Sequence, residues 1–274
     1  MENCYVFEAG STKTALIYKQ NGEKHELTLP GFNPNVENDD FIKELKSSLT
    51  IPAEAEIIFY GSGLANEENK NVVRSIFEPF APSRIKVFDD ILGAARSVFK
   101  NDAGIICIMG TGGLAAYYNG KEIVKRRGGY GYLIDDLGGG FELGRRFISS
   151  WRKGDLSESI SNELEIKLGS DAISYSAKIY ETKDLRLISG VVPLIVDYKE
   201  DTFVSQFLSR YFSDFIDQDI LPLYTEFDIN KVSVVGSLGT AFYKVLRDEL
   251  KLHGLQLEQC VQNPIQRLFE YHQH

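Results

Sequence analysis

The sequence predicts an α/β protein in which one β-β-β-α-β-α-β-α unit occurs twice. Two stretches, residues 4–28 and 104–124, each contain an apolar strand pattern, a turn of small residues, a second strand and a hairpin signal, in that order. Amphipathic helix patterns and apolar strands then follow in both halves. The two halves agree in the order of their elements more than in residue identity, so the repeat indicates a duplicated fold.

The first half opens with the apolar run CYVFE at residues 4–8. After a small-residue turn and the strand TALIY, Asn21-Gly22 is a strong hairpin signal, because both residues tolerate the positive φ of a tight turn. The third strand is HELTL at 25–29. The remaining elements expected here are a helix patterned by Phe41, Ile42, Leu45 and Leu49, a strand at 56–60, a helix beginning near Glu67, a strand at 84–88 and a helix after Asp90.

The second half repeats this series. The strand GIICIM at 104–109 is followed by the turn at 110–113, the strand LAAYY and a second hairpin signal, Asn119-Gly120. The elements expected next are the strand KEIV, a strand at 232–235, a helix near 239–251, a short strand at 255–259 and a last helix near 264–272.

A segment at about 139–230 interrupts the second half and is predicted to be helical. Its apolar residues recur at helical spacing, which favours the core of a helical subdomain over a cofactor site. Trp151, the single Trp, is interpreted as a packing residue. The predicted core stripes are Phe141/Leu143/Phe147/Ile148, Ile160/Leu164/Ile166/Leu168 and Phe203/Phe207/Phe212/Phe215/Ile216.

Two such halves with a cleft between them describe the duplicated ribonuclease H-like fold of the actin-like ATPases. We predict a first lobe over residues 1–101 and a second over 102–274, with a hinge near 100–103. Whether the last helix packs on the first lobe is left open by the sequence.

Composition excludes several classes of partner. The net charge of −9 argues against nucleic acid and anionic membranes, both of which favour positive surfaces. No apolar run is long enough to span a membrane, and the N-terminus does not have the pattern of a signal peptide. Cys4, Cys107 and Cys260 form no metal or disulfide pattern, so we expect reduced thiols in a cytoplasmic protein.

The small-residue turns are the first candidates for chemistry. Gly allows close approach of a ligand to the backbone, and Ser and Thr hydroxyls add donors, so two such turns can hold a triphosphate. The alternative for the first turn alone is an ordinary hairpin with a solvated Lys; the second turn favours the phosphate interpretation. The residues concerned are Glu8, Gly10, Ser11, Thr12 and Lys13 in the first turn and Gly110, Thr111, Gly112 and Gly113 in the second.

Carboxylates next to these turns are candidate acid–base groups. Asp90 ends a strand and opens a helix, where it can accept a proton from a substrate hydroxyl or act as an N-cap, and Asp89 can share these two roles. Residues 128–144 are rich in Gly around Asp135 and Asp136, which favours a ligand-contacting loop over a mobile surface loop.

These motifs resemble the N-acetylglucosamine kinase-like branch of the BadF/BadG/BcrA/BcrD ATPases over nearly the whole chain. EAGSTKT is similar to D-G-G-[GS]-T-K-T, and IMGTGG to the family's second phosphate motif, G-T-G-S-N. DDILGAAR resembles D-x-x-x-A-A-R, and GYGYLIDDLGGGFELGR resembles G-Y-x-x-G-D-E-G-S-G-x-x-L-G-[KR]. The further resemblances are PGFNP to the substrate loop, YGSGL to the strand and turn after it, VVGSLGTAF to the adenosine-side motif and NPIQRLFEYH to the terminal motif.

The resemblance implies a role for each matched position. Asp90 is implied to be the catalytic base, Asn33 and Asp136 to contact the sugar, and residues 236–239, with Gly236 and Ser237, to line the adenosine side. Glu8 stands where the family has the Asp that serves the metal. The other departures from the family pattern are Ala9, Gly113-Leu114, Asp135, Leu137 and Arg267.

The function predicted from this resemblance is phosphorylation of an amino sugar by ATP with Mg²⁺. One alternative is a sugar or nucleotide sensor that has lost polar site residues, as Leu114 and Leu137 suggest. A less favoured alternative is the dehydratase-activating ATPase of the same family, which needs cysteines in a cluster-binding motif that this chain does not have. The specific sugar, the hydroxyl and the oligomeric state, including a homodimer, are left open.

Overall fold

The computed structural model describes residues 3–10 and 12–273, and the chain folds into two compact units. Unit 1 consists of Met1–Asp102, Tyr118–Ile123 and Asn263–His274, and unit 2 consists of Ala103–Tyr117 and Val124–Gln262. The end of the second hairpin and the last helix therefore group with unit 1, although both follow residue 102 in the sequence.

Unit 1 is built on a mixed five-stranded sheet in the order β3-β2-β1-β4-β5. The central strand β1 pairs antiparallel with β2 and parallel with β4, and β4 pairs parallel with β5. This is the arrangement expected for the first copy of the repeat. Its elements are β1 (Cys4–Ala9), β2 (Lys13–Gln20), β3 (Glu23–Pro30), α1 (Asp39–Ser48), β4 (Glu56–Gly61), α2 (Glu67–Phe77), the 3₁₀ turn η1 (Glu78–Phe80), β5 (Arg84–Asp89), α3 (Asp90–Phe99) and α13 (Ile265–Tyr271).

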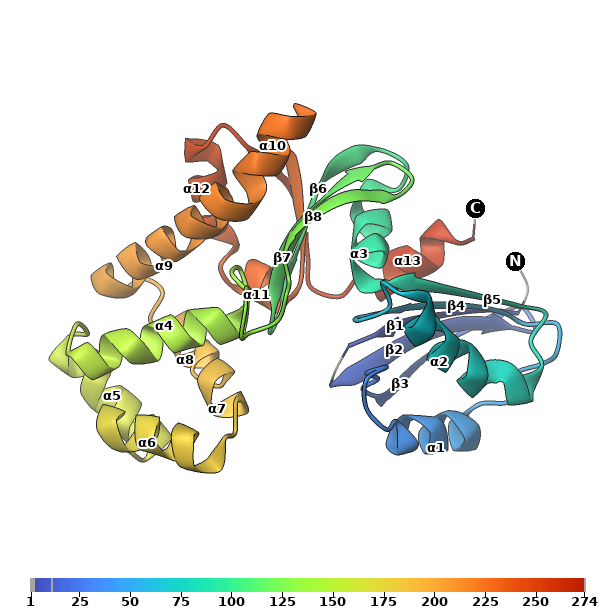
Figure 1. Cartoon of the computed structure of the whole chain (residues 1–274), viewed down its shortest axis with the longest axis horizontal. Coiled ribbons are helices and arrows are strands. Elements are labelled where there is room, and N and C mark those ends of the chain that lie inside the picture. The colour runs from blue at the N-terminus through green and yellow to red at the C-terminus, as the bar shows by residue number, and fades with distance from the viewer. Residues whose placement is uncertain (1–2, 11, 274) are drawn as a thin grey trace. The chain divides into compact units, whose positions relative to one another are not determined.

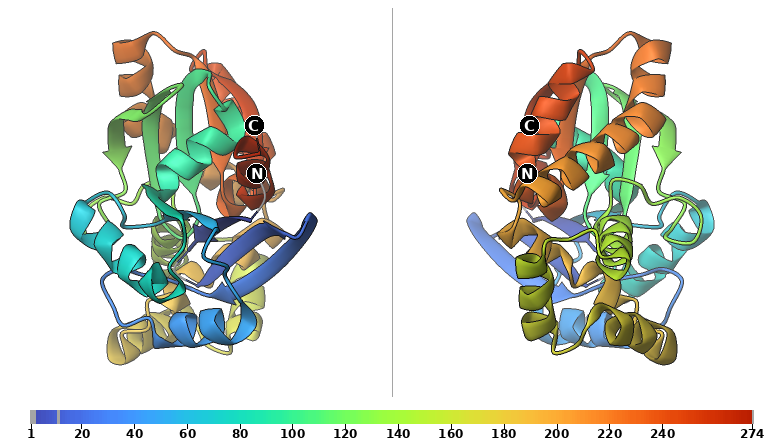
Figure 2. Two further views of the ribbon diagram at one scale, coloured as in Figure 1. Left: turned by 90° about the vertical axis from the view of Figure 1, so that its right-hand side faces the viewer. Right: turned by 90° about the vertical axis from the view of Figure 1, so that its left-hand side faces the viewer.

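Helices cover both faces of this sheet. Tyr5 and Phe7 of β1 belong to the core that includes residues of α1 and α2, because alternate strand residues point to opposite faces. Cys4 and Val6 belong to the other face, where Leu268 of α13 packs. The first strand and the last helix thus lie side by side (Figure 1 and Figure 2).

The two hairpin signals form turns with different residues at their tips. Gln20 pairs with Glu23, so Asn21-Gly22 is the loop, with φ of 52° and 84°. In the second hairpin the N–H of Asn119 donates to the carbonyl of Glu122 at 3.2 Å, which makes Gly120 and residue 121 the loop. The hairpin prediction is confirmed, but the second loop lies one residue further along the chain than the signal suggested.

Unit 2 contains the second five-stranded sheet, in the order β10-β9-β6-β7-β8. The strand β9 pairs parallel with both β6 and β10. The predicted α/β duplicated fold is therefore confirmed, since both sheets have the same arrangement of five strands. The elements outside the helical insertion are β6 (Ala103–Met109), β7 (Gly113–Asn119), β8 (Ile123–Gly128), β9 (Lys231–Val235), α11 (Ser237–Ala241), α12 (Tyr243–Leu252) and β10 (Gln256–Val261).

The insertion between β8 and β9 is helical throughout, and its helices share one large core with the sheet (Figure 1). A π-helical turn, η2, joins the inserted helices α9 and α10 without a break in the helix. The insertion consists of α4 (Gly140–Lys153), α5 (Glu158–Leu168), α6 (Ala172–Thr182), α7 (Arg186–Ser189), α8 (Val192–Asp197), α9 (Thr202–Phe215), η2 (Ile216–Ile220) and α10 (Leu221–Phe227).

Two details of the sequence prediction in unit 2 were wrong. Ile166 was placed in a core stripe, but 80% of it is exposed, because only positions spaced by four from Ile160 lie on the buried face of α5. The helix expected near 239–251 is two helices, α11 and α12, separated at Phe242.

The single Trp packs in the core as predicted, and the three Cys residues are free thiols. Trp151 is buried, and its indole N–H donates to the hydroxyl of Ser161 at 2.9 Å. Cys4 and Cys107 are fully buried free thiols, while Cys260 is partly exposed. Within the described residues, no helix has the length and apolar character that crossing a bilayer requires.

Candidate functional site

The carboxyl ends of three parallel strands meet at one edge of the sheet in unit 1. Ala9 of β1 pairs with Gly61 of β4, and Gly61 pairs with Asp89 of β5. The residues that follow these strands, Gly10 and Asp90 among them, therefore emerge at the same edge. In open α/β sheets this edge is the usual place for ligands.

The turn after β1 is closed by its own backbone. The N–H of Gly10 donates to the carbonyl of Lys13 at 2.9 Å, and the carbonyl of Gly10 accepts the N–H of Phe32 at 3.1 Å. The side chains of Thr12 and Lys13 are exposed. The second of these bonds ties the predicted substrate loop to the predicted phosphate turn. Ser11, also predicted to bind ATP, lies outside the described residues.

Asn33 is held in this loop by other Asn side chains. The side chain of Asn38 accepts the backbone N–H of Asn33 at 3.0 Å and donates to its carbonyl at 2.9 Å. The Oδ1 atom of Asn33 accepts the N–H of Asn35 at 2.9 Å. The side-chain oxygen therefore stabilises the turn. The side-chain NH₂ group is then the part of Asn33 that would bind a hydroxyl.

Glu8, Asp89 and Asp90 bring carboxylates to this edge. Burial raises the pKa of Glu8, and the charge of Lys13 lowers it in part, so the carboxylate lies in a setting where a cation would be strongly bound. Asp90 is the first residue of α3, and its Oδ1 accepts the N–H of Ile91 at 2.8 Å. Asp89 occupies the N-cap position but makes no capping hydrogen bond with its side chain.

The turn after β6 in unit 2 receives the N-terminus of α4. The N–H of Gly110 donates to the carbonyl of Gly112 at 3.0 Å and closes the turn. Two carbonyl groups of the turn accept hydrogen bonds from the first residues of α4. The N–H of Gly140 donates to the carbonyl of Gly110 at 2.8 Å, and the N–H of Phe141 donates to the carbonyl of Thr111 at 2.9 Å. The glycine-dense segment (residues 128–144) and the predicted phosphate turn (residues 110–113) are thus joined through their backbones.

Glycine is required at this junction because the two backbones touch. A Cβ on Gly113 would lie 2.2 Å from the carbonyl oxygen of Leu137, and one on Gly139 would lie 2.5 Å from the carbonyl carbon of Gly112. The side chain of Asp136 lies against the same turn, where its Oδ1 accepts the N–H of Gly113 at 3.3 Å. Burial and then the charges of neighbouring carboxylates raise the pKa of Asp136, against the effect of that hydrogen bond.

A cavity of about 540 Å³ opens beside this turn, within unit 2. Three of the predicted ATP-binding residues, Gly110, Thr111 and Ser237, line it, and a Cβ on Gly110 would meet no atom within 4 Å. The volume is in the range of small-molecule sites. The helical insertion supplies lining residues that sequence reasoning missed, and no local motif marked them. They are Ser189, Val192, Pro193, Val196 and Asp197.

The other predicted residues of unit 2 lie around the cavity without lining it. Gly236 has a φ of 133°, and a Cβ there would lie 2.2 Å from the carbonyl oxygen of Met109. Gly236 therefore allows β9 to pass close to β6 and turn into α11. Gly112, Gly113 and Asp136 lie against one another in the same turn, where a Cβ on Gly112 would meet Oδ1 of Asp136 at 2.8 Å.

Residues on one face of α9 and η2 pack against the glycine-dense segment. The hydroxyl of Tyr211 donates to the carbonyl of Gly139 at 2.7 Å, and the ring of Phe215 fills the space beside Gly138. Four residues further on, Asp219 lies beside Gly128. Its side chain is 4% exposed, and its Oδ2 atom is buried with no hydrogen-bond partner among the described residues. This carboxylate lies in the π-helical turn, and no sequence motif marked it as a candidate.

The buried carboxyl of Asp219 makes stability depend on pH. Burial and then the charge of Asp135 raise its pKa from 3.8 to about 6. Between these values the folded protein binds more protons here than the unfolded chain does, so the free energy of unfolding falls as the pH rises. We expect a loss of about 3 kcal/mol from this group.

Urea unfolding at acidic and neutral pH measures this loss. Asp219→Asn should show a smaller fall in the free energy of unfolding between pH 4 and 6 than wild type does, and it should be the more stable protein at neutral pH. The exposed Asp248 provides the control, since Asp248→Asn should retain the wild-type slope. Equal slopes in wild type and Asp219→Asn would contradict the assignment.

Comparisons with known proteins agree with this architecture. No family model matches the chain, and a search of curated proteins also finds no match. A solved structure named "Putative N-acetylglucosamine Kinase" from Porphyromonas gingivalis has a TM-score of 0.85 and 26% identity, over 98% of each chain. A structure of the same name from Chromobacterium violaceum has a TM-score of 0.75 and 18% identity, over 97% of this chain and 98% of that one.

A ROK hexokinase from Thermus thermophilus shares the fold more distantly. Its TM-score is 0.51 at 12% identity, over 98% of this chain and 97% of the hexokinase. The chain therefore has the actin-like ATPase fold, and over nearly its whole length it is similar in structure to proteins named as putative N-acetylglucosamine kinases.

Proposed function

We propose that this protein is an ATP-dependent kinase that phosphorylates a hydroxyl of an amino sugar. In unit 1, Asp90 acts as the general base, Asn33 binds the sugar, and the turn at residues 10–13 binds phosphate. In unit 2, Asp136 binds the sugar, the turn at 110–113 binds phosphate, and Gly236-Ser237 supports the adenosine side. Catalysis depends on positioning these groups and on neutralising the phosphate charge.

The observation that carries this proposal is the cavity beside the second turn. Gly110 presents bare backbone to it, Thr111 and Ser237 add hydroxyl groups, and apolar residues of α8 form another part of the wall. A backbone turn beside an apolar surface suits a ligand with a phosphate at one end and a flat base at the other. The similarity of the fold to proteins named as N-acetylglucosamine and hexose kinases supports the same choice.

The residues present fit a Mg²⁺ ion that arrives with the nucleotide. Within the described residues there is no group of three His, Cys, Asp or Glu side chains that could form a complete metal site. Mg²⁺ on a nucleotide keeps several waters and needs only one or two carboxylates besides the phosphates. The half-buried carboxylate of Glu8 would supply one of these, and the metal would neutralise phosphate charge.

A turnover assay with a panel of amino sugars tests the proposal. We expect ADP release from MgATP to depend on one amino sugar and to exceed the rate with neutral hexoses. Circular dichroism and a cooperative unfolding transition would show that the assayed protein is folded. ATP consumption that no sugar changes would contradict the kinase assignment.

Glu8 is expected to make turnover slow, because its side chain is one methylene longer than the Asp at this position in the family pattern. Glu8→Asp should raise the rate, and Glu8→Gln should abolish it, since the amide does not carry the charge that binds the metal. The dependence of the rate on Mg²⁺ concentration measures both effects. A rate that is the same in wild type and Glu8→Gln would remove Glu8 from the metal site.

A sugar or nucleotide sensor is the second candidate, and one observation favours it. Leu137, next to the sugar-binding candidate Asp136, is 4% exposed and belongs to the core of unit 2. This position therefore presents an apolar side chain to the core and no polar group to a ligand. Saturable sugar binding without turnover would select this function. The dehydratase-activating alternative is disfavoured because Cys4 and Cys107 are buried in strands.

A further inference from the structure

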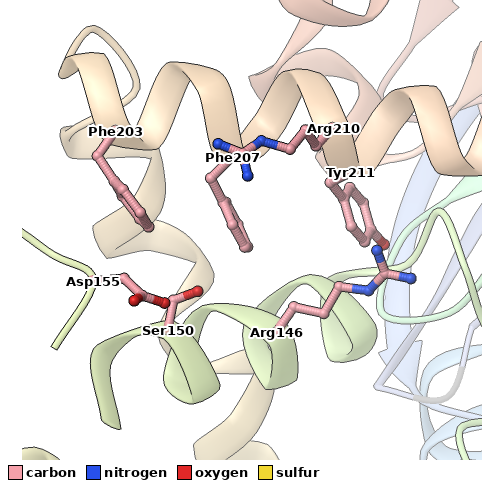
Figure 3. A pocket seen from close by; sticks show the side chains of 7 residues that line it. All are labelled: Arg146, Ser150, Asp155, Phe203, Phe207, Arg210 and Tyr211. Carbon is pink, nitrogen blue, oxygen red and sulfur yellow. The ribbon is translucent and has the colours of Figure 1, made fainter. Parts of the chain in front are cut away.

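A second cavity in unit 2, of about 420 Å³, lies between α4 and α9 (Figure 3). It shares no lining residue with the cavity beside the phosphate turn. Its volume suits a ligand of one ring or of a short carbon chain. The side chains that line it are Arg146, Ser150, Asp155, Phe203, Phe207, Arg210 and Tyr211.

Two phenylalanine rings form the apolar wall of this groove. Phe203 and Phe207 lie one turn apart on α9 with nearly parallel rings, 6.3 Å between centroids. Phe207 also packs edge-on against Phe147 at 5.6 Å, which fixes its orientation. Both Phe203 and Phe207 are only partly buried, and their rings point from α9 toward α4. Their outer faces are apolar surface that a ligand would cover.

Two guanidinium groups line the groove, Arg146 from α4 and Arg210 from α9 (Figure 3). Arg146 is held in place, because it donates to Glu142 at 2.8 Å and to Asp214 at 2.5 Å and lies over the ring of Tyr211. Arg210 extends along α9 toward Phe207 (Figure 3), and no described residue forms an ion pair with it. A guanidinium without a partner, next to an apolar wall, is suited to bind a carboxylate.

Acceptor groups lie at the other end, beneath Phe203. The backbone N–H of Asp155 donates to the carbonyl of Ser150 at 3.0 Å, which keeps the two residues together where α4 ends. Figure 3 shows their side chains side by side on the α4 side of the groove. An ionised carboxylate and a hydroxyl at this position would accept hydrogen bonds from an ammonium group.

We propose that this groove binds a small zwitterion with an apolar body, such as an amino-substituted aromatic carboxylate. Its carboxylate pairs with Arg210, its body covers Phe203 and Phe207, and its ammonium group meets Asp155 and Ser150. Tyr211 links the groove to the candidate site, because the same side chain lines the groove and hydrogen-bonds Gly139 at 2.7 Å. An occupant would therefore stiffen the residue that supports the glycine-dense segment.

Three related probes test the two charged ends separately. The probes are 4-(aminomethyl)benzoate, benzoate without the ammonium group, and benzylamine without the carboxylate, each titrated by NMR into the full chain. We expect 4-(aminomethyl)benzoate to bind at least about fivefold more tightly than the other two, since each charge-assisted contact adds to affinity.

Variants then assign each end of the probe to a residue. Arg210→Gln should lower the affinity for 4-(aminomethyl)benzoate and for benzoate about tenfold and leave the affinity for benzylamine unchanged. Asp155→Asn should lower the affinity for the two probes that carry an ammonium group and leave the affinity for benzoate unchanged. Arg186→Gln, at an exposed Arg outside the groove, is the matched control and should change nothing. The proposal would be overturned if 4-(aminomethyl)benzoate did not bind or if all three probes bound with equal affinity. It would also be overturned if Arg210→Gln and Arg186→Gln had equal effects.

Discussion

Asp90→Asn is expected to lower phosphoryl transfer by about 10²–10⁴-fold while sugar binding is retained, because general-base catalysis contributes an effect of this size. The amide keeps the shape of the carboxylate and can still accept the N–H of Ile91, which Asp90 accepts at 2.8 Å. The helix α3 should therefore begin at the same residue. Initial rates at saturating sugar and MgATP, with sugar affinity from calorimetry, measure the two effects.

Asp89 provides the matched control, since it is the adjacent carboxylate and the N-cap of the same helix. Asp89→Asn removes the same charge one residue earlier, where the strand β5 ends. We expect a rate change of less than about tenfold, because a nearby charge that takes no proton acts only through its field. The base would be misassigned if Asp89→Asn were the more damaging change, or if wild type and Asp90→Asn consumed ATP at the same background rate.

Gly113→Ala is expected to destabilise unit 2 by about 3 kcal/mol, because overpacking against fixed backbone has a cost of this order. The added Cβ would lie 2.2 Å from the carbonyl oxygen of Leu137 and 2.4 Å from the nitrogen of Gly139. Neither atom belongs to a flexible side chain, so the junction between turn and helix must open. The free energy of unfolding in urea measures the loss.

Gly110→Ala is the contrasting variant within the same turn. Its Cβ would meet no atom within 4 Å, and its φ is not in the positive range. We therefore expect stability to stay the same or to rise by about 0.4–1 kcal/mol. The methyl group would project beside the candidate nucleotide cavity, so the affinity for an ATP analogue should fall. Similar unfolding transitions for the two variants would contradict the close backbone contact at Gly113.

The sequence was a good guide to the sheets because their signals are local. Alternating apolar residues and hairpin dipeptides indicate strands from a few neighbouring residues alone. The order of strands and helices in both halves could therefore be predicted. The second hairpin shows the limit of this reasoning. There the side chain of Asn119 accepts the N–H of residue 121 at 2.9 Å, so Asn119 stabilises the loop from its first position instead of lying at the tip.

The candidate site was predictable only where its residues lie in motifs at strand ends. The face of α9 and η2 that supports Gly139 and Gly138 was not predictable, because it depends on tertiary packing and on a π-helical turn. The same holds for Asp219, whose sequence neighbours give no sign that its carboxyl is buried. The lining residues from α7 and α8 approach the phosphate turn only after the insertion has folded.

The position of α13 has a consequence for synthesis on the ribosome. Leu268 and Phe269 complete the face of the first sheet that contains Cys4, Val6 and Ile58. When residues 1–102 have left the exit tunnel, the α13 segment has not yet been translated, so only α3 can cover this face of β1 and β4, and the part that α13 occupies remains open while unit 2 is made. The nascent chain would therefore expose an apolar sheet surface for most of its translation, which is the kind of surface that holdase chaperones bind.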